Sequence, residues 1–262
     1  FWSMVVVLMI RHNPPPSPSF WQLPILFMAR NSSITVAEIS AMKNRGERIS
    51  CLTVYDYSFA EILDKAGVEI LLVGDSLGMV IQGHATTLPT TMNDVVYHTQ
   101  CVSRGCRNAL LIADMPFGSF QGSPQTAFEN AVRLMGEGGA HMVKIEGGAV
   151  MNETVAFLSE RGIPVCGHLG LTPQSVNQFG GFRVQGRQPS AAEELWRDAQ
   201  SLDEAGVSLL VLEAMPSNLA KEITGSISTP TIGIGAGPHT DGQVLVLYDV
   251  LGIYPKKSPK FS

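Results

Sequence analysis

The sequence predicts one large (β/α)8 barrel, and two observations support this fold class. From residue 48 onward, short apolar segments alternate with amphipathic stretches, and the segments are near-continuously apolar, which is typical of parallel strands covered on both faces. The chain has 262 residues, of which 45% are hydrophobic, and barrels of this class commonly need ~250 residues. An open doubly wound sheet is the alternative arrangement of the same elements.

Eight strands are expected along the chain. They cover residues 48–56, 69–75, 108–114, 142–146, 164–168, 209–213, 230–235 and 243–248. The segment 236–242 is too short for a helix between the last two strands, and few residues remain after 248 for a closing helix. We therefore expect a barrel whose C-terminal closure is incomplete.

The helices between the strands have readable ends. Ser123 before Pro124 is typical of an N-cap followed by the first helical residue. The run 190–193, Ser-Ala-Ala-Glu, has the pattern of a capping box. Three further helices are predicted to begin at Asn93, Asn152 and Ser217.

Composition argues against several classes of partner. The formal net charge is -5 and no basic run appears, so a nucleic-acid-binding surface is not expected. The longest strictly apolar run, residues 4–10, is too short to span a bilayer. Four cysteines do not make a disulfide framework in a chain of this length, which fits a reducing compartment. We expect a cytoplasmic protein that binds a small neutral or anionic molecule.

Residues 1–27 differ from the rest of the chain. They are first apolar and then rich in Pro and Ser, and no acidic residue occurs before Glu38. A signal or transit peptide is one interpretation, but a clean cleavage pattern is missing. We expect Met28 to begin the functional protein, with 1–27 as a disordered or artefactual extension and 28–262 as a single catalytic domain with a truncated C-terminal end.

Polar side chains gather where the predicted strands end, which is where barrels of this class place their active sites. These ends carry Asp56, Asp75, Ser76, Asp114, Lys144, Glu146, His168 and Glu213. Buried carboxylates are costly unless they are paired or bind a metal, and a hard cation such as Mg²⁺ accepts carboxylates together with substrate and water. Asp75, Asp114 and Glu146 are therefore predicted to converge on one divalent cation.

Each of these residues also has a purely structural interpretation. Asp75 and Asp114 precede residues typical of turns, which aspartate often caps. Glu146 precedes two glycines, so it is also a candidate for the start of a helix, and its contact with the metal is then through water. Lys144 lies on the same strand face as Glu146 and suits either a structural ion pair or a substrate carboxylate.

Two residues are candidates for proton transfer. Glu213 ends the most hydrophobic strand, a setting that favours a general base, and the alternative is a salt bridge to a neighbouring strand. His168 is a second candidate acid or base, and the alternative is a scaffold that only hydrogen-bonds. The glycine run 233–237 is typical of an anion cradle after the seventh strand or of close packing.

Seven linked motifs are more specific than any single residue. They are TVYDYSFA (53–60), LLVGDSLGMVIQGHATTLPTT (71–91), ADMPFGS (113–119), MVKIEGG (142–148), CGHLGLTPQSVNQFGGFRVQGR (166–187), LLVLEAMP (209–216) and IGIGAGPHTDGQVLV (232–246). In this order and spacing the chain resembles the ketopantoate hydroxymethyltransferase family of pantothenate biosynthesis, from about residue 33 to 252.

The resemblance implies a reaction, its cofactors and its residues. A hydroxymethyl group would move from 5,10-methylenetetrahydrofolate to 3-methyl-2-oxobutanoate through a Mg²⁺-stabilised enolate, giving 2-dehydropantoate. The resemblance makes Asp75 and Asp114 ligands of one Mg²⁺ per subunit, with Glu146 in or behind the coordination shell, and makes Glu213 the proton acceptor. Substrate would be bound by Asp75, Ser76, Asp114 and Lys144. It also implies a cytoplasmic homo-oligomer, a decamer in the family, and the loop 171–187 is the natural candidate for a lid or folate-side wall.

Two other functions compete with this one. Mg²⁺-dependent lyases and mutases of the phosphoenolpyruvate mutase and isocitrate lyase type resemble the predicted barrel, but they generally carry a reactive cysteine in a Lys-Lys-Cys-Gly loop, which this sequence lacks. An inactive truncated barrel is the third reading. It depends on the last residues alone, since the family continues through a segment resembling HIPKFAKNF.

Overall fold

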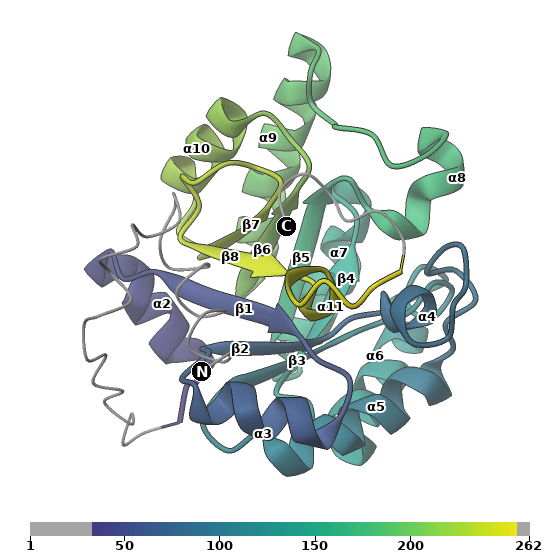
Figure 1. Cartoon of the computed structure of the whole chain (residues 1–262). Helices are drawn as coiled ribbons and strands as arrows, with labels where there is room; N and C mark the ends of the chain where they lie inside the picture. The colour runs from purple at the N-terminus through teal and green to yellow at the C-terminus, as the bar shows by residue number, and fades with distance from the viewer. Residues whose placement is uncertain (1–32, 256–262) are drawn as a thin grey trace.

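The computed structural model describes residues 33–255, in which eight parallel strands form a closed barrel (Figure 1). The strands are β1 Ile49–Thr53, β2 Ile70–Val73, β3 Leu110–Asp114, β4 Met142–Glu146, β5 Val165–Gly170, β6 Leu209–Glu213, β7 Thr231–Ile234 and β8 Gly242–Leu245. The last strand pairs with the first, from Ile49 opposite Gly242 to Leu52 opposite Leu245. The predicted fold class is confirmed, and the expected incomplete closure does not occur in the sheet. The predicted extension 1–27 lies outside the described residues.

Several helices, among them α3, α5, α7 and α9, pack on the outer side of the strands (Figure 1). The helices of the described chain are α2 Val36–Arg45, α3 Tyr57–Lys65, α4 Leu77–Val80, α5 Met92–Gly105, α6 Pro124–Val132, α7 Asn152–Ser159, α8 Val176–Phe179, α9 Pro189–Ala205, α10 Ser217–Ser226 and α11 Leu247–Val250, with the short helical turns η2 Arg133–Glu137, η3 Ala149–Met151 and η4 Pro173–Ser175. Within the described chain no helix separates β7 from β8, as the short spacing predicted. No helix between residues 33 and 255 is long and apolar enough to cross a bilayer.

The structure confirms three of the predicted helix starts and corrects two. The hydroxyl of Ser123 accepts a hydrogen bond from the N–H of Thr126, with Pro124 as the first helical residue. The capping box at 190–193 is wrong, because Pro189 already begins α9 and its fixed φ is suited to that first position. The helix predicted to begin at Asn93 begins one residue earlier, at Met92, because Thr91 and Asp94 form the capping box there. The starts predicted at Asn152 and Ser217 are confirmed.

The barrel interior changes from apolar to charged along the strands. Alternate residues of a strand share one face, and one buried apolar cluster includes Ile49, Cys51, Ile70, Leu72, Leu110, Ile112, Met142, Cys166, Leu209, Val211, Ile232 and Val244. Two residues beyond Ile112 the same face of β3 carries Asp114, and two beyond Met142 the same face of β4 carries Lys144. The carboxyl end of the barrel is therefore its charged end.

Helix α2 packs against the apolar end of this interior. Ile39 and Met42 belong to the same cluster as the strand residues. Lys43 Nζ donates to the main-chain carbonyls of Thr224, Ile227 and Thr229 at 2.9–3.1 Å. Because two of these carbonyls belong to the C-terminal end of α10 and the residue that follows it, the lysine occupies the end of a helix where cations are favoured.

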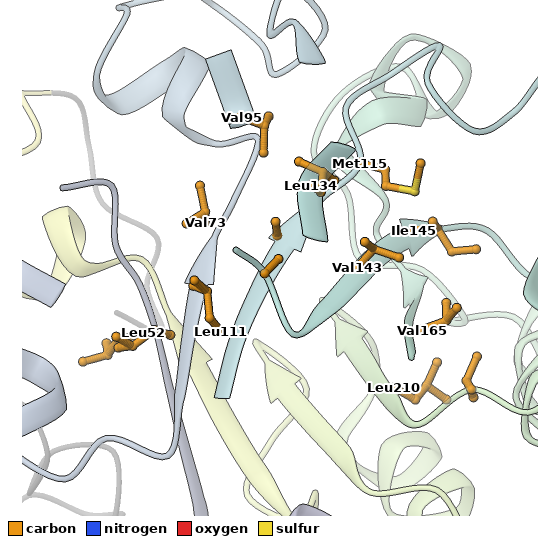
Figure 2. Packing of buried hydrophobic residues seen from close by; sticks show 14 of the residues in the cluster. Leu52, Val73, Val95, Leu111, Met115, Leu134, Val143, Ile145, Val165 and Leu210 are labelled. Atoms are coloured by element: carbon orange, nitrogen blue, oxygen red, sulfur yellow. The ribbon is translucent and has the colours of Figure 1, made fainter. Parts of the chain in front are cut away.

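A second apolar cluster lies between the strands and the outer helices (Figure 2). Val143 and Ile145 of β4 belong to it, together with Leu134 of η2 and Val95 of α5. The intervening residue, Lys144, faces the barrel interior and lines the cavity described below. One short strand therefore supplies both the outer core and the charged end of the barrel.

Candidate active site

A cavity of about 580 Å³ opens at the carboxyl ends of the strands. Its lining includes all the residues predicted to bind metal or substrate or to transfer a proton, namely Asp75, Ser76, Asp114, Lys144, Glu146, His168 and Glu213. They come from the ends of β2 through β6, and the volume is typical of a small-molecule site. Asp56 is placed elsewhere, since it caps α3 by accepting from the N–H of Phe59.

Asp114 and Lys144 form a buried ion pair in the cavity. Asp114 Oδ1 lies 2.7 Å from Lys144 Nζ, while Asp114 Oδ2 accepts from the main-chain N–H of Asp75 at 3.0 Å. Burial opposes the charge of Lys144, but the carboxylates of Asp114, Glu146 and Asp75 outweigh it and raise the lysine pKa above its ordinary value. Lys144 therefore stays protonated and positively charged at the carboxyl end of the barrel near neutral pH.

Asp75 stands in the opposite electrostatic situation. Its side chain is 3% exposed, and burial, followed by the charges of Asp114 and Glu146, raises its pKa well above the ordinary value. Its Oδ2 accepts from the side-chain amide of Gln174 at 2.9 Å. A carboxyl group destabilised by neighbouring negative charge is one that a bound cation would return to its charged form.

His168 lies between two glutamates. Its Nδ1 is 3.3 Å from Glu146 Oε1, and its Nε2 is 3.1 Å from Glu213 Oε2. Burial and Lys144 lower the pKa of His168, but the two glutamates outweigh them and raise it to about 9. Burial raises the pKa of Glu146, yet His168 and Lys144 bring it below its ordinary value. Near neutral pH, His168 is thus a cation that joins Glu146 to Glu213.

This arrangement predicts a specific pH dependence of stability in protein kept free of divalent cations. The folded-state pKa of His168, about 9, exceeds the value near 6.5 of an unperturbed histidine, so its stabilisation is complete below about pH 6.5 and is lost as pH rises through about 9. The unfolding free energy of the wild type should exceed that of His168→Asn by roughly 3 kcal/mol more at pH 6 than at pH 10. Urea unfolding across this range measures the difference, and a gap that does not narrow would contradict the bridge.

The described residues, 33–255, contain no set of three or more Asp, Glu, His or Cys side chains arranged to hold one metal ion. That Asp75, Asp114 and Glu146 share one cation stays a prediction, and the charges of Asp114 and Glu146 do act on Asp75. Glu146 lies beside His168 and accepts a hydrogen bond from the main-chain N–H of Gln174. Asp75 and Asp114 remain as an adjacent pair.

Three cavity-side residues were not singled out from the sequence. Gln174 is 6% exposed and contacts the acidic residues of the site. Thr87 is 2% exposed, and among the described residues its hydroxyl has no hydrogen-bond partner although it lines the cavity. Tyr55 places its hydroxyl 2.8 Å from Ser76 Oγ. All three lie within the linked motifs quoted above, and this location in the sequence was the only feature that could have indicated a role in the site.

The chain turns sharply just after Glu213. Ala214 has φ 46°, the one non-glycine residue with positive φ between residues 33 and 255. Its N–H donates to the carbonyl of Ile234, and its own carbonyl accepts from the N–H of Gln185. The loop that includes Phe182 and Arg183 also lines the cavity, so this turn ties the loop to the end of β6.

The fold and the cavity together define a (β/α)8-barrel enzyme with an acidic, lysine-bearing site at the carboxyl ends of its strands. The chain belongs to the ketopantoate hydroxymethyltransferase family, whose model matches residues 33–262. It is 58% identical over 229 residues to the 3-methyl-2-oxobutanoate hydroxymethyltransferase of Thiobacillus denitrificans, covering 87% of each chain. It is 61% identical over 223 residues to that of Methylobacillus flagellatus, covering 85% of each.

Solved structures with low sequence identity share the fold. A phosphonomutase-like protein of Burkholderia cenocepacia gives a TM-score of 0.65 at 12% identity, covering 84% of this chain and 95% of that one. A phosphonopyruvate hydrolase complex with oxalate and Mg²⁺ gives 0.60 at 13% identity, covering 80% and 79%. At these identities the likeness concerns the barrel alone.

Proposed function

We propose that this protein transfers a hydroxymethyl group from 5,10-methylenetetrahydrofolate to 3-methyl-2-oxobutanoate, giving 2-dehydropantoate. The observation that carries this function is the cavity at the end of the barrel, which holds an aspartate pair, a buried lysine and a histidine-linked glutamate in a chain closely similar to hydroxymethyltransferases. A keto acid needs a Lewis acid at its oxygen and a base near its C3 proton, and this site offers groups for both.

The side chains in the cavity fit a divalent cation held by two carboxylates. The cavity lining contains five carboxylates (Asp75, Asp114, Glu146, Glu213 and Asp249) and three groups that can carry positive charge (Lys144, His168 and Arg183). When all of them are ionised, the lining has an excess of two negative charges. Mg²⁺ is commonly bound through one or two carboxylates and keeps positions for substrate and water. Asp75 and Asp114 would hold the ion, with Glu146 behind them. Bound there, Mg²⁺ would polarise the keto oxygen of the substrate and increase the acidity of its C3 proton.

The remaining groups would bind the substrate and move its proton. The Lys144 ammonium suits the substrate carboxylate, while Ser76 and Thr87 offer hydroxyl groups in the same cavity. Glu213 keeps 17% of its side chain exposed, so one carboxylate oxygen can reach a bound molecule while His168 holds the other. Glu213 would take the C3 proton, and the carbon would then attack the methylene carbon of the folate. The two bonds from that carbon to the folate nitrogens would break, one as its iminium form opens and one as tetrahydrofolate leaves, and a water molecule would supply the hydroxyl oxygen of the product.

The cavity also suits a second, larger substrate. A small keto acid occupies only part of about 580 Å³. The rest is lined by apolar residues and by Phe182, Arg183 and Val184 of the loop tied to Ala214. The folate would bind in this part of the cavity. A cytoplasmic homo-oligomer, as the family resemblance implies, is part of the same proposal.

The test is proton exchange without folate. In D₂O with Mg²⁺, the protein should remove the C3 proton signal of 3-methyl-2-oxobutanoate, followed by proton NMR, and chelation of the metal should stop the exchange. Addition of 5,10-methylenetetrahydrofolate should then give 2-dehydropantoate. A folded protein that binds Mg²⁺ and the keto acid without exchange would refute the proposed reaction and favour an inactive barrel.

A further inference from the structure

Gln174 connects the ends of three neighbouring strands. It lies in η4, in the loop after β5, and is buried. Its Nε2 is 2.9 Å from Asp75 Oδ2, just after β2, and 2.9 Å from the carbonyl oxygen of Met115, just after β3. Its main-chain N–H donates to Glu146 Oε2, at the end of β4, at 2.9 Å.

Chemistry fixes the orientation of this amide. A carboxylate oxygen and a carbonyl oxygen both accept hydrogen bonds, and an amide oxygen has no hydrogen to donate to either. The NH₂ group must therefore face Asp75 and Met115. The amide oxygen then faces Gln121, whose Nε2 donates to it at 3.0 Å. Gln121 is itself oriented, because its own amide oxygen accepts from the N–H of Gly118 at 2.8 Å. Gln174 therefore has one stable orientation.

We infer that Gln174 is a positioning residue for the site: its amide holds one oxygen of Asp75 and thereby presents the other oxygen to the cavity. The side chain is neutral, so it adds no charge that would compete with a bound cation. It also comes from a different loop than Asp75, Asp114 or Glu146, so it fixes the spacing between strand ends. Groups of this kind, behind a metal ligand, commonly change metal affinity by about 10–100-fold when removed.

This role depends on the metal site proposed above, and the experiment distinguishes a failure of the positioning role from a failure of the metal site. Mn²⁺ serves as the probe, with its binding to the full-length protein followed by electron paramagnetic resonance. Gln174→Met keeps the length of the side chain and the main-chain N–H to Glu146, but removes both amide donors. We expect its Mn²⁺ Kd to rise about tenfold or more. At saturating metal, the C3 proton exchange rate should stay within about threefold of the wild type, because the base and its partner are untouched.

Matched variants make the result decisive. Gln200→Met, on the outer surface of α9 where the amide bonds only Ser226, should bind Mn²⁺ like the wild type. Gln121→Leu leaves the Gln174 donors in place but removes the support of the Gln174 amide oxygen, together with the acceptor for the Gly118 N–H. Its Kd should rise by about threefold, and it decides the question if Gln174→Met does not fold. Wild-type affinity in a folded Gln174→Met, or in Gln121→Leu in its place, would overturn the positioning role.

If Asp75→Asn also binds Mn²⁺ normally, the metal site and the positioning role both fail. If only Asp75→Asn loses binding, the positioning role fails alone.

Discussion

Glu213→Gln should lower the rate of C3 proton exchange by about 10²–10⁴-fold while the keto acid still binds. The amide keeps the size of the side chain but cannot accept the proton, and the contact of His168 with Glu146 is preserved. Proton NMR in D₂O measures the exchange, and calorimetry measures binding of the keto acid in the presence of Mg²⁺.

The matched control is Glu193→Gln, on the exposed surface of α9 where the carboxylate pairs with Arg197. It should exchange at the wild-type rate. Exchange that persists in Glu213→Gln would transfer the role of base to a bound water or to His168, and the histidine would then have to lose the proton that its two glutamates stabilise.

Asp75→Asn should weaken Mg²⁺ binding by about 100-fold or more, because it replaces a proposed ligand and not merely a group behind one. Folding should not suffer. In metal-free protein the charged form of Asp75 is disfavoured by burial, Asp114 and Glu146, so a neutral amide should raise the melting temperature. Calorimetry with Mg²⁺ and a thermal melt in chelator measure the two effects.

Asp94→Asn is the control for this second variant, since Asp94 belongs to the capping box of α5 at the surface and an asparagine oxygen can still accept the capping hydrogen bond. Its Mg²⁺ affinity should not change. Normal Mg²⁺ affinity in both Asp75→Asn and Asp114→Asn would remove the metal from the mechanism.

The sequence predicted the barrel and the members of the site because both follow from local patterns. Runs such as 209–213 are apolar enough to be buried on both faces, and a polar residue at the end of such a run must lie at the barrel end. The same rule placed Asp114 and Glu213 in one cavity. The number of strands and their places along the chain could therefore be predicted without knowledge of any long-range contact, whereas the pairing of β8 with β1 is what excludes the open sheet that the sequence left as an alternative.

The contacts inside the site could not be predicted in this way. Gln174 is separated from Glu146 by 28 residues and from Asp75 by 99, and no local pattern connects them. The partner of Glu146 depends on the register of β4 against β5, which sets Glu146 opposite His168. A one-residue change of register would turn the alternate face inward.

The left-handed turn at Ala214 restricts which amino acids can follow the glutamate of β6. Such a backbone geometry costs a residue with a Cβ about 1–2 kcal/mol, and glycine or asparagine tolerates it best. In a library randomised at this one position and screened for stability, glycine and asparagine should be recovered, while valine and isoleucine should be depleted because branching at Cβ makes the conformation still less favourable. Alanine thus holds this left-handed turn at a smaller cost than a β-branched residue would, one peptide bond from the proposed base.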